Sequence, residues 1–346
     1  MPRPTIKDVA TAAGVSKGAV SFALNDRPGV APETRRRILE AAERLGWTPS
    51  PRARALSVSR ALAVGLVLAR PARVLRADAF FPAFISGLES ALSEHGHALL
   101  LQVAEHDDEA AYRRLAAGGR VDGVLVTDLQ VDDPRPALLE ELALPAVIVG
   151  PHLGDGFGPQ QSALGVDDVP GVTAAVRHLA RLGHTRVAHV SGPLRMVHGR
   201  SRRDAWAVAM AAAGLPVGPL VEADFSAESG AAAMRTLLRL EEPPTAVVFA
   251  NDVMAMAGLS VAQARGVSVP RDLSVTGYDD TEIAAHLQPP LTTVAIDVVA
   301  WGRAAALRLL ELVDGRPPSP VDLPPARLVV RGSTGPAPTT SSSSSS

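Results

Sequence analysis

At 346 residues with 47% apolar residue types, the chain is long enough to bury more than one hydrophobic core. It contains no cysteine, which excludes disulfides, thiolate metal sites and a cysteine nucleophile. Residues 1–60 carry 11 Lys or Arg against 5 Asp or Glu, whereas the remainder carries 23 against 31. A basic head on an acidic body is typical of a head that meets nucleic-acid phosphates.

Residues 5–25 predict two short helices joined by a glycine turn. Thr5 can cap the first helix, and Asp8 can reach back to it as in a capping box. Gly14 permits a sharp turn, and Ser16 can cap a second helix that Asn25 ends. The first helix has apolar residues at i, i+3, i+4 and i+7, which are Ile6, Val9, Ala10 and Ala13.

The second predicted helix, residues 17–24, offers one face to solvent. The residues expected to point inward are Val15, Val20 and Leu24, and those expected to point outward are Lys17, Gly18, Ser21 and Phe22. This is the pattern of a helix-turn-helix whose second helix enters a DNA major groove. A helical hairpin that packs on a larger domain would show the same spacing, but the basic charge at this place favours DNA binding.

A third helix is predicted from Pro32, with Glu33 in its first turn and Gly46 after its end. Its expected inward stripe is Ile38, Ala41, Ala42 and Leu45. Ser50 and Pro51 then begin a further helix of about two turns, which is too short to be stable alone in water. We therefore expect a linker that becomes helical only when something holds it.

From residue 62 onward, short apolar runs alternate with helical patterns. The predicted buried strands are 62–69, 97–103, 121–126, 145–150, 185–192, 245–250 and 273–278. The predicted helices include 84–94, 171–182, 203–213 and 252–265. Alternation of this kind indicates an α/β fold with doubly wound parallel sheets, whose ligands bind at the carboxyl ends of the strands. The number of strands predicts two such lobes.

The chain resembles the LacI/GalR family of bacterial transcription regulators. The matching segments are TIKDVATAAGVS, VSFALN, VAPETRRRILEAAERLGWTPSPRARAL and, at 329–334, VVRGST. The resemblance implies a helix-turn-helix headpiece over 1–49, a hinge helix over 50–61 and a body of periplasmic-binding-protein type over 62–333. The expected lobes are about 62–161 with 292–322, and 162–291 with 323–333. The low-complexity tail, 334–346, is expected to be disordered.

The resemblance also implies how DNA is bound. Two hinge helices pair across a homodimer in the minor groove, where Leu56 wedges between base pairs and Ala53 permits close approach. A plain linker with a stray leucine is the alternative. The residues expected to contact a near-palindromic operator are Thr5, Ser16, Lys17, Gly18, Ser21, Phe22, Asn25, Ala53 and Leu56. No heptad helix follows Val330, so we expect a dimer.

In the body, the resemblance implies a small-molecule effector, most simply a sugar or sugar derivative, between the lobes. Arg202, Asn251 and Asp279 match family positions for hydroxyl recognition. Phe80 and Phe81 could stack on the effector, although we expect one of them to be core. The alternatives are a surface role for Arg202 and helix-capping roles for Asn251 and Asp279.

Two departures from the family pattern affect these expectations. Gly150 stands where many relatives have an acidic residue, and His152 nearby is a doubtful replacement. Phe22 stands where arginine is common, so the half-site should be unusual, with thymine methyls as one target for this ring.

The remaining patterns exclude other classes. The scattered histidines predict no metal site, and we find no nucleophile elbow, phosphate loop or cofactor motif. We therefore expect no enzyme activity and no cofactor. A solute-binding protein is the other rival, but no signal peptide precedes the basic headpiece. We expect a repressor in the cytoplasm, associated with the nucleoid, and no membrane partner.

Overall fold

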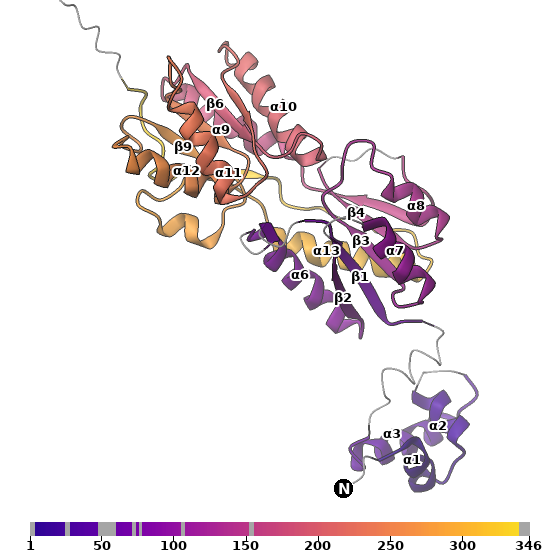
Figure 1. Cartoon of the computed structure of the whole chain (residues 1–346). Coiled ribbons are helices and arrows are strands. Elements are labelled where there is room, and N and C mark those ends of the chain that lie inside the picture. The colour runs from indigo at the N-terminus through magenta and orange to yellow at the C-terminus, as the bar shows by residue number, and fades with distance from the viewer. Residues whose placement is uncertain are drawn as a thin grey trace, which may run out of the picture. The chain divides into compact units, whose positions relative to one another are not determined.

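The structure is a computed structural model that describes residues 4–24, 28–47, 60–70, 74–75, 78–104, 108–151 and 156–338. The chain forms two compact units, one of Met1–Leu62 with Gly119–Val121 and the other of Ala63–Gly118 with Asp122–Ser346. The first unit is called the headpiece and the second the body (Figure 1). Within the described ranges, no helix is long and apolar enough to cross a membrane.

The headpiece has three helices, α1 (Ile6–Ala13), α2 (Lys17–Leu24) and α3 (Pro32–Arg44). The Asp8 carboxylate accepts hydrogen bonds from the Thr5 amide and hydroxyl, both at 2.8 Å. Gly14 ends α1 with a φ of 65°, which glycine adopts without strain. The Ser16 hydroxyl oxygen accepts from the Ala19 amide at 3.1 Å. The predicted start of the first helix, the turn at Gly14 and the start of the second helix are therefore confirmed.

A small apolar core holds these helices together. It consists of Val9, Ala10, Ala13, Val20, Ala23, Ile38, Ala41 and Ala42. Ala23 was not predicted, and Leu24 is only half-buried. The prediction that Leu45 points inward is wrong, because the chain leaves the helix there, and this side chain is 36% exposed. Asn25 and the hinge residues Ala53 and Leu56 lie outside the described residues.

The first lobe of the body contains a parallel sheet of order β2-β1-β3-β4-β5. Its strands are β1 (Ala63–Leu68), β2 (Ala98–Val103), β3 (Gly123–Val126), β4 (Ala146–Val149) and β5 (Gln161–Leu164). Its helices are α6 (Phe80–Glu94), α7 (Asp108–Ala117), α8 (Arg135–Glu141) and the distant α13 (Val298–Val313). We predicted β2 to be buried, which is wrong, because it is an edge strand on which Leu101 and Val103 are about half exposed.

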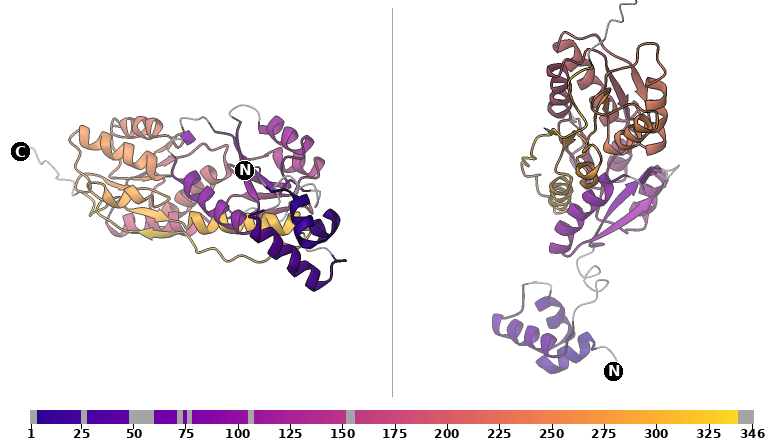
Figure 2. Two further views of the ribbon diagram at one scale, coloured as in Figure 1. Left: turned by 90° about the horizontal axis from the view of Figure 1, so that it is seen from below. Right: turned by 90° about the vertical axis from the view of Figure 1, so that its left-hand side faces the viewer.

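Helix α13 returns from far along the chain to pack on α6, and Figure 2 shows this pair from two further directions. Glycines make the close approach possible. A Cβ at Gly87 would lie 2.1 Å from the carbonyl oxygen of Val299, and one at Gly302 would lie 2.2 Å from that of Phe84. Any side chain at either position would force the two helices apart.

The second lobe contains a parallel sheet of order β7-β6-β8-β9. Its strands are β6 (Val187–Ser191), β7 (Leu220–Glu222), β8 (Ala246–Phe249) and β9 (Ser274–Thr276). Its helices are α9 (Val169–Arg181), α10 (Val197–Ala212), α11 (Ala227–Leu237), α12 (Asp252–Ala264) and the short 3-10 helix η1 (Glu282–His286). Both lobes are therefore doubly wound α/β units, as predicted.

Three segments connect the lobes, and their limits differ from those expected. Strand β5 lies wholly in the first sheet, so the lobe limit expected near residue 161 falls at this strand and is too early. The sequence did not predict β5, because some of its residues are polar. The second segment contains β10 (Thr293–Ala295), which pairs antiparallel with β11 (Arg327–Val329) of the third. Thr293 donates a hydrogen bond to Asp252 of the second lobe, so this crossing comes after β10.

The C-terminal segment is docked on the second lobe as far as Ala337. The carbonyl oxygen of Gly335 lies 3.0 Å from Nε2 of His184, and the Ala337 amide donates to the Leu182 carbonyl at 2.8 Å. The expectation of disorder is therefore wrong for residues 334–338. Amino-acid composition did not indicate this docking, because the C-terminal segment is bonded mostly through its own backbone groups. Residues 339–346 lie outside the described residues.

Candidate nucleic-acid interface and ligand cleft

The outer face of α2 carries the side chains predicted to read DNA. Lys17, Gly18 and Phe22 are exposed, with Phe22 42% accessible, whereas Ser21 is half-buried. Val20 and Ala23 anchor the opposite face of α2 in the headpiece core. Thr5 and Ser16 are exposed at the helix starts, where the Ser16 hydroxyl caps α2. A short helix with one anchored face and one free face can enter a major groove.

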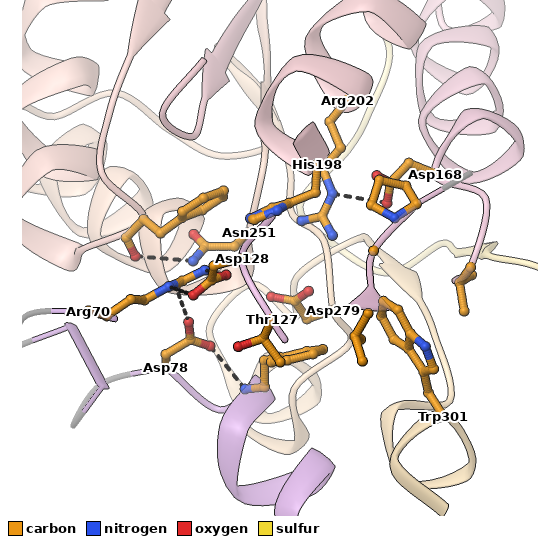
Figure 3. Close-up of a pocket in the computed structure, with 16 residues that line it drawn as sticks. Arg70, Asp78, Thr127, Asp128, Asp168, His198, Arg202, Asn251, Asp279 and Trp301 are labelled. Carbon is orange, nitrogen blue, oxygen red and sulfur yellow. Dashed lines mark hydrogen bonds and ion pairs between the residues drawn. The ribbon is translucent and has the colours of Figure 1, made fainter. Parts of the chain in front are cut away.

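A cavity lies between the two lobes of the body, with about 580 Å³ of space that is partly open to solvent. Sixteen residues from both lobes line it, as Figure 3 shows. In the first lobe the strand order reverses between β1 and β3, and the residues after these strands reach the cavity. They are Arg70, Thr127 and Asp128. Ligands of doubly wound sheets bind at such reversal points.

Arg70 is bonded to two carboxylates on the first-lobe side. Its Nε and Nη2 donate to Asp128 at 2.6 and 2.5 Å, and its Nη1 donates to Asp78 at 2.7 Å. Asp78 also accepts from the Phe80 amide at 3.0 Å. Burial would raise the pKa of Asp128, but Arg70 outweighs it and lowers that pKa below its usual value. For Asp78 burial prevails and raises the pKa.

Arg202 is bonded in a second network on the other side. Its Nε donates to Oδ1 of Asp168 at 3.1 Å, and its Nη1 donates to the Ala250 carbonyl at 2.6 Å. The guanidinium carbon lies 3.6 Å from the ring centroid of Tyr278, whose hydroxyl donates to the same Asp168 oxygen at 2.6 Å. The other Asp168 oxygen, Oδ2, is buried without a hydrogen-bond partner among the described residues.

Asp279 lies close enough to Arg70 and Arg202 to attract both electrostatically. Within the described chain no group donates a hydrogen bond to its carboxylate, and Figure 3 draws it among the cavity side chains. Burial raises its pKa well above the usual value, and three neighbouring aspartates, Asp252, Asp78 and Asp168, act in the same direction against Arg202. The 3-10 helix that follows starts after Thr281, so Asp279 is not its cap.

Asn251 combines the two roles considered for it. Its side-chain oxygen accepts from the Met254 amide at 2.9 Å and caps α12, while its amide nitrogen donates to the Phe225 carbonyl at 3.1 Å. It also lines the cavity. The second N–H of this amide and the second lone pair of its oxygen are left for a ligand.

Aromatic side chains form two walls of the cavity. In the first lobe, Phe80 and Trp301 meet edge to face with centroids 5.8 Å apart. In the second lobe, His198 stacks on Phe225 at 5.1 Å. Burial, with Arg202 and Arg70 nearby and Asp128 in opposition, lowers the pKa of His198 to about 3. At neutral pH this ring is therefore uncharged, with one nitrogen to donate and one to accept.

The lobes are also bonded directly beside the cavity. The Val197 amide donates to the Leu129 carbonyl at 2.8 Å, and the Val131 amide donates to the Arg195 carbonyl at 2.9 Å. These two backbone bonds form a short antiparallel bridge between the segment after β3 and the segment before α10. A movement of one lobe against the other must break or shift this bridge.

Four predicted effector residues, Phe80, Arg202, Asn251 and Asp279, line the cavity, and Arg202 is buried rather than superficial. The fifth, Phe81, does not line the cavity and is the one of the two phenylalanines that belongs to the core, as expected for one of them. It is 2% exposed in the first-lobe core, where its ring supports Arg70 at 5.3 Å from the centroid. Gly150 lines the cavity, whereas His152 lies outside the described residues.

The sequence reasoning missed Arg70, Asp78, Asp128, Asp168, His198, Phe225 and Trp301. Arg70 and Asp128 could have been found, because they closely follow two predicted strands at the ends where ligands bind. Phe225 and Trp301 come from a loop and a helix, and no strand end indicated them.

Two family models match the chain. Residues 5–50 match "Bacterial regulatory proteins, lacI family", and residues 176–334 match "Periplasmic binding protein-like domain". Among curated proteins, the transcriptional regulator CelR of Thermobifida fusca is 37% identical over 93% of this chain and 95% of its own length. The repressor CytR of Escherichia coli strain K12 is 32% identical over 95% of this chain and 96% of its own.

Solved structures give the same result. A CelR–cellobiose complex has a TM-score of 0.73 at 36% identity, covering 96% of this chain and 100% of that one. The lac repressor dimer bound to operator and an anti-inducer has a TM-score of 0.81 at 28% identity, with the same two coverages. These relatives are transcription regulators, not enzymes.

Proposed function

Because the chain belongs to the lacI family of bacterial regulatory proteins and is a DNA-binding transcription regulator, we propose that it is a homodimeric repressor controlled by a sugar. The sugar, or a derivative of one, binds in the cleft between the lobes of the body. The two headpieces of the dimer occupy half-sites of a near-palindromic operator, and the hinge residues 50–61 meet the minor groove between them.

The main observation in favour of a sugar ligand is that some carboxylate oxygens in the cleft receive no hydrogen bond from the described part of the protein. Oδ2 of Asp168 is buried and unpaired, and the Asp279 carboxylate receives no hydrogen bond from the described chain. Leaving a buried acceptor unpaired costs about 1–3 kcal/mol, which a ligand hydroxyl would recover. Phe80 and Trp301 offer ring surfaces to the apolar faces of a pyranose. The relative solved with cellobiose supports the same ligand class.

The dimer is supported by two exposed sheet edges. Strand β2 is the outer strand of the first sheet and β7 that of the second. Leu101 and Val103 of β2 are 48% and 51% exposed, and Leu220 of β7 is 39% exposed. Uncovered apolar edge strands invite pairing with other chains, so native proteins cover them. A second copy of the chain is the occupant that a twofold-symmetric operator requires.

The proposed mechanism couples the cleft to the hinges. The effector contacts both lobes, so it binds one lobe arrangement better than the other and shifts the population toward it. That shift changes the backbone bridge between Leu129 and Val197, and with it the distance between the two hinges of the dimer. Coupling of this kind is typically about 1–3 kcal/mol and reciprocal, so operator DNA must change effector affinity by the same factor.

The first experiment is selection of binding sites from random duplexes with the full-length chain at near-physiological salt. We expect a near-palindrome with a central CG step, and enrichment of a single half-site would contradict the dimer. A promoter that contains the selected site should be silenced by the protein in transcription assays. Activation of that promoter would contradict repression.

The effector is tested by adding sugar pools to the protein–operator complex. A sugar that changes operator affinity should act on the native chain and not on Asp279→Asn, which should still bind the operator. Asparagine tolerates the φ of 111° at this position, so the substitution leaves the backbone intact. A normal sugar response in this variant would show that the cleft is not the effector site.

A further inference from the structure

We propose that the cleft selects an uncharged, unphosphorylated sugar and rejects its phosphate ester, and that the group Asp78–Arg70–Asp128 makes this choice. This inference rests on the sugar effector proposed above and narrows its chemical class. It concerns the three first-lobe residues that the sequence patterns did not identify. The argument depends on which charges of the cleft are already neutralised by the protein itself.

The charged side chains that line the cavity are four carboxylates and two guanidinium groups. They are Asp78, Asp128, Asp168, Asp279, Arg70 and Arg202. No lysine is among the described residues that line it, and His198 is neutral because burial lowers its pKa to about 3. Among the described residues, the lining therefore has more carboxyl groups than cationic groups, and a bound anion would lie among them.

Neither arginine offers a whole guanidinium fork to an anion, although Nη2 of Arg202 makes no hydrogen bond within the described chain. All three nitrogens of Arg70 donate to Asp128 or Asp78, with both oxygens of Asp128 engaged by a parallel pair of bonds. Arg202 donates from Nε and Nη1, and the face of its guanidinium lies against Tyr278. Bidentate phosphate binding by arginine needs two neighbouring guanidinium nitrogens that face the ligand, and in each arginine at least one nitrogen of every such pair is bonded to the protein's own oxygens.

The helix starts at the cavity are occupied as well. Helix α9 begins after Asp168, and its first amide, that of Val169, donates to Asp167 at 2.9 Å. Helix α12 begins after Asn251, whose side chain accepts from Met254. A helix N-terminus binds phosphate through such amides, but here a carboxylate and a side-chain amide oxygen already hold one amide of each helix.

The cleft also has buried carboxylate oxygens that lack donors among the described residues, and these suit the hydroxyls of a neutral polyhydroxyl ligand. Oδ2 of Asp168 and the carboxylate of Asp279 both need donors. The raised pKa values of Asp78 and Asp279 have burial as their main cause and show that this cleft already disfavours negative charge. A sugar hydroxyl satisfies these oxygens without adding charge.

The test measures binding of cellobiose, maltose and trehalose, each beside its 6-phosphate, to the full-length protein by calorimetry. We expect at least one unphosphorylated sugar to bind, and its phosphate to bind about tenfold more weakly or worse. A phosphate that binds as tightly as its parent sugar would overturn the inference while leaving a sugar effector in place. If neither member of any pair binds or changes operator affinity, the proposed sugar function fails and the inference fails with it.

A second arm tests the three-residue group directly. Asp128→Asn removes the negative charge that faces Arg70 and leaves this arginine with excess positive charge. The preference for the unphosphorylated sugar over its phosphate should therefore shrink about tenfold. Asp78→Asn removes the other partner and should act in the same direction, which keeps the test valid if Asp128→Asn does not fold. Glu94→Gln is the matched control. It makes the same change in net charge at a surface pair with Arg303, 2.7 Å long, outside the cavity. A preference unchanged in both aspartate variants, or equally changed in the control, would refute the role of the group.

Discussion

The hydroxyl of Tyr278 donates a 2.6 Å hydrogen bond to Oδ1 of Asp168, which joins the end of β9 to the first crossing between the lobes. The same oxygen accepts from Arg202, so one carboxylate holds both a strand end and a cleft arginine. Two groups from separate parts of the chain thus depend on one side chain. The position of Arg202 in the cleft follows from this arrangement.

Tyr278→Phe should therefore weaken the effector response and lower the free energy of unfolding by about 2 kcal/mol, because a hydrogen bond to a charged group is lost. The phenylalanine ring still lies beneath Arg202, so the body should fold. Denaturant unfolding and effector titration measure the two effects. Tyr112→Phe is the control, since it removes a buried hydroxyl that lies beside Arg135 and bonds no carboxylate of the described residues. Equal losses in both variants would contradict the role of the Asp168 bond.

Leu56→Ala should weaken specific operator binding by about tenfold to a hundredfold, the equivalent of about 1.5–3 kcal/mol of leucine burial. Loss of the wedge should also reduce the bend of the operator in gel-shift experiments. Effector affinity measured without DNA should not change, because the substitution is in the hinge. The hypothesis is abandoned if affinity and bending both stay as in the native chain.

Because His189 is buried, we expect the protein to lose stability in mild acid. Burial lowers its pKa from 6.5 to about 4, so below pH 6.5 the unfolded chain takes up a proton that the native ring refuses. Stability from this group is complete above pH 6.5 and falls by about 3 kcal/mol as the pH decreases to 4. His189→Asn removes the titrating ring and retains an N–H for the Val248 carbonyl, to which Nδ1 donates at 2.8 Å.

The measurement for His189 is the free energy of unfolding between pH 7 and 4, followed by tryptophan fluorescence. The variant should start less stable, because the stack of His189 on Trp206 is lost. Its stability should nevertheless fall less steeply with decreasing pH. Parallel curves for the two proteins would show that the buried ring does not cause the acid sensitivity.

Truncation after Ser333 should destabilise the body by about 2 kcal/mol, since His184, Ser274 and Leu182 lose hydrogen-bond partners worth about 0.5–1.5 kcal/mol each. Truncation after Pro338 keeps these contacts and serves as the control. Chemical denaturation distinguishes the two proteins. Similar unfolding midpoints would mean that the docked segment contributes nothing to stability.

Local sequence signals predicted the headpiece and the strand–helix alternation of the body. Thr5 with Asp8, Gly14 and Ser16 define helix starts and a turn through bonds that span three to five residues, so their pattern is readable without a fold. The four strands concealed from the sequence, β5, β7, β10 and β11, have only three or four residues each, and none stands in an apolar run like the one that marked the equally short β8. Such short segments become strands only when a neighbouring strand pairs with them.

The sequence by itself determined that a DNA-reading headpiece precedes a two-lobed α/β body, because caps, turns and apolar periodicity act between near neighbours along the chain. Only the tertiary structure decided which side chains share the cleft. Arg70 and Asp128 are 58 residues apart and meet because the sheet places β1 beside β3. Phe80 and Phe81 are adjacent, yet packing against α13 puts one in the cleft and the other in the core. Those choices depend on strand order and helix packing, which only long-range contacts specify.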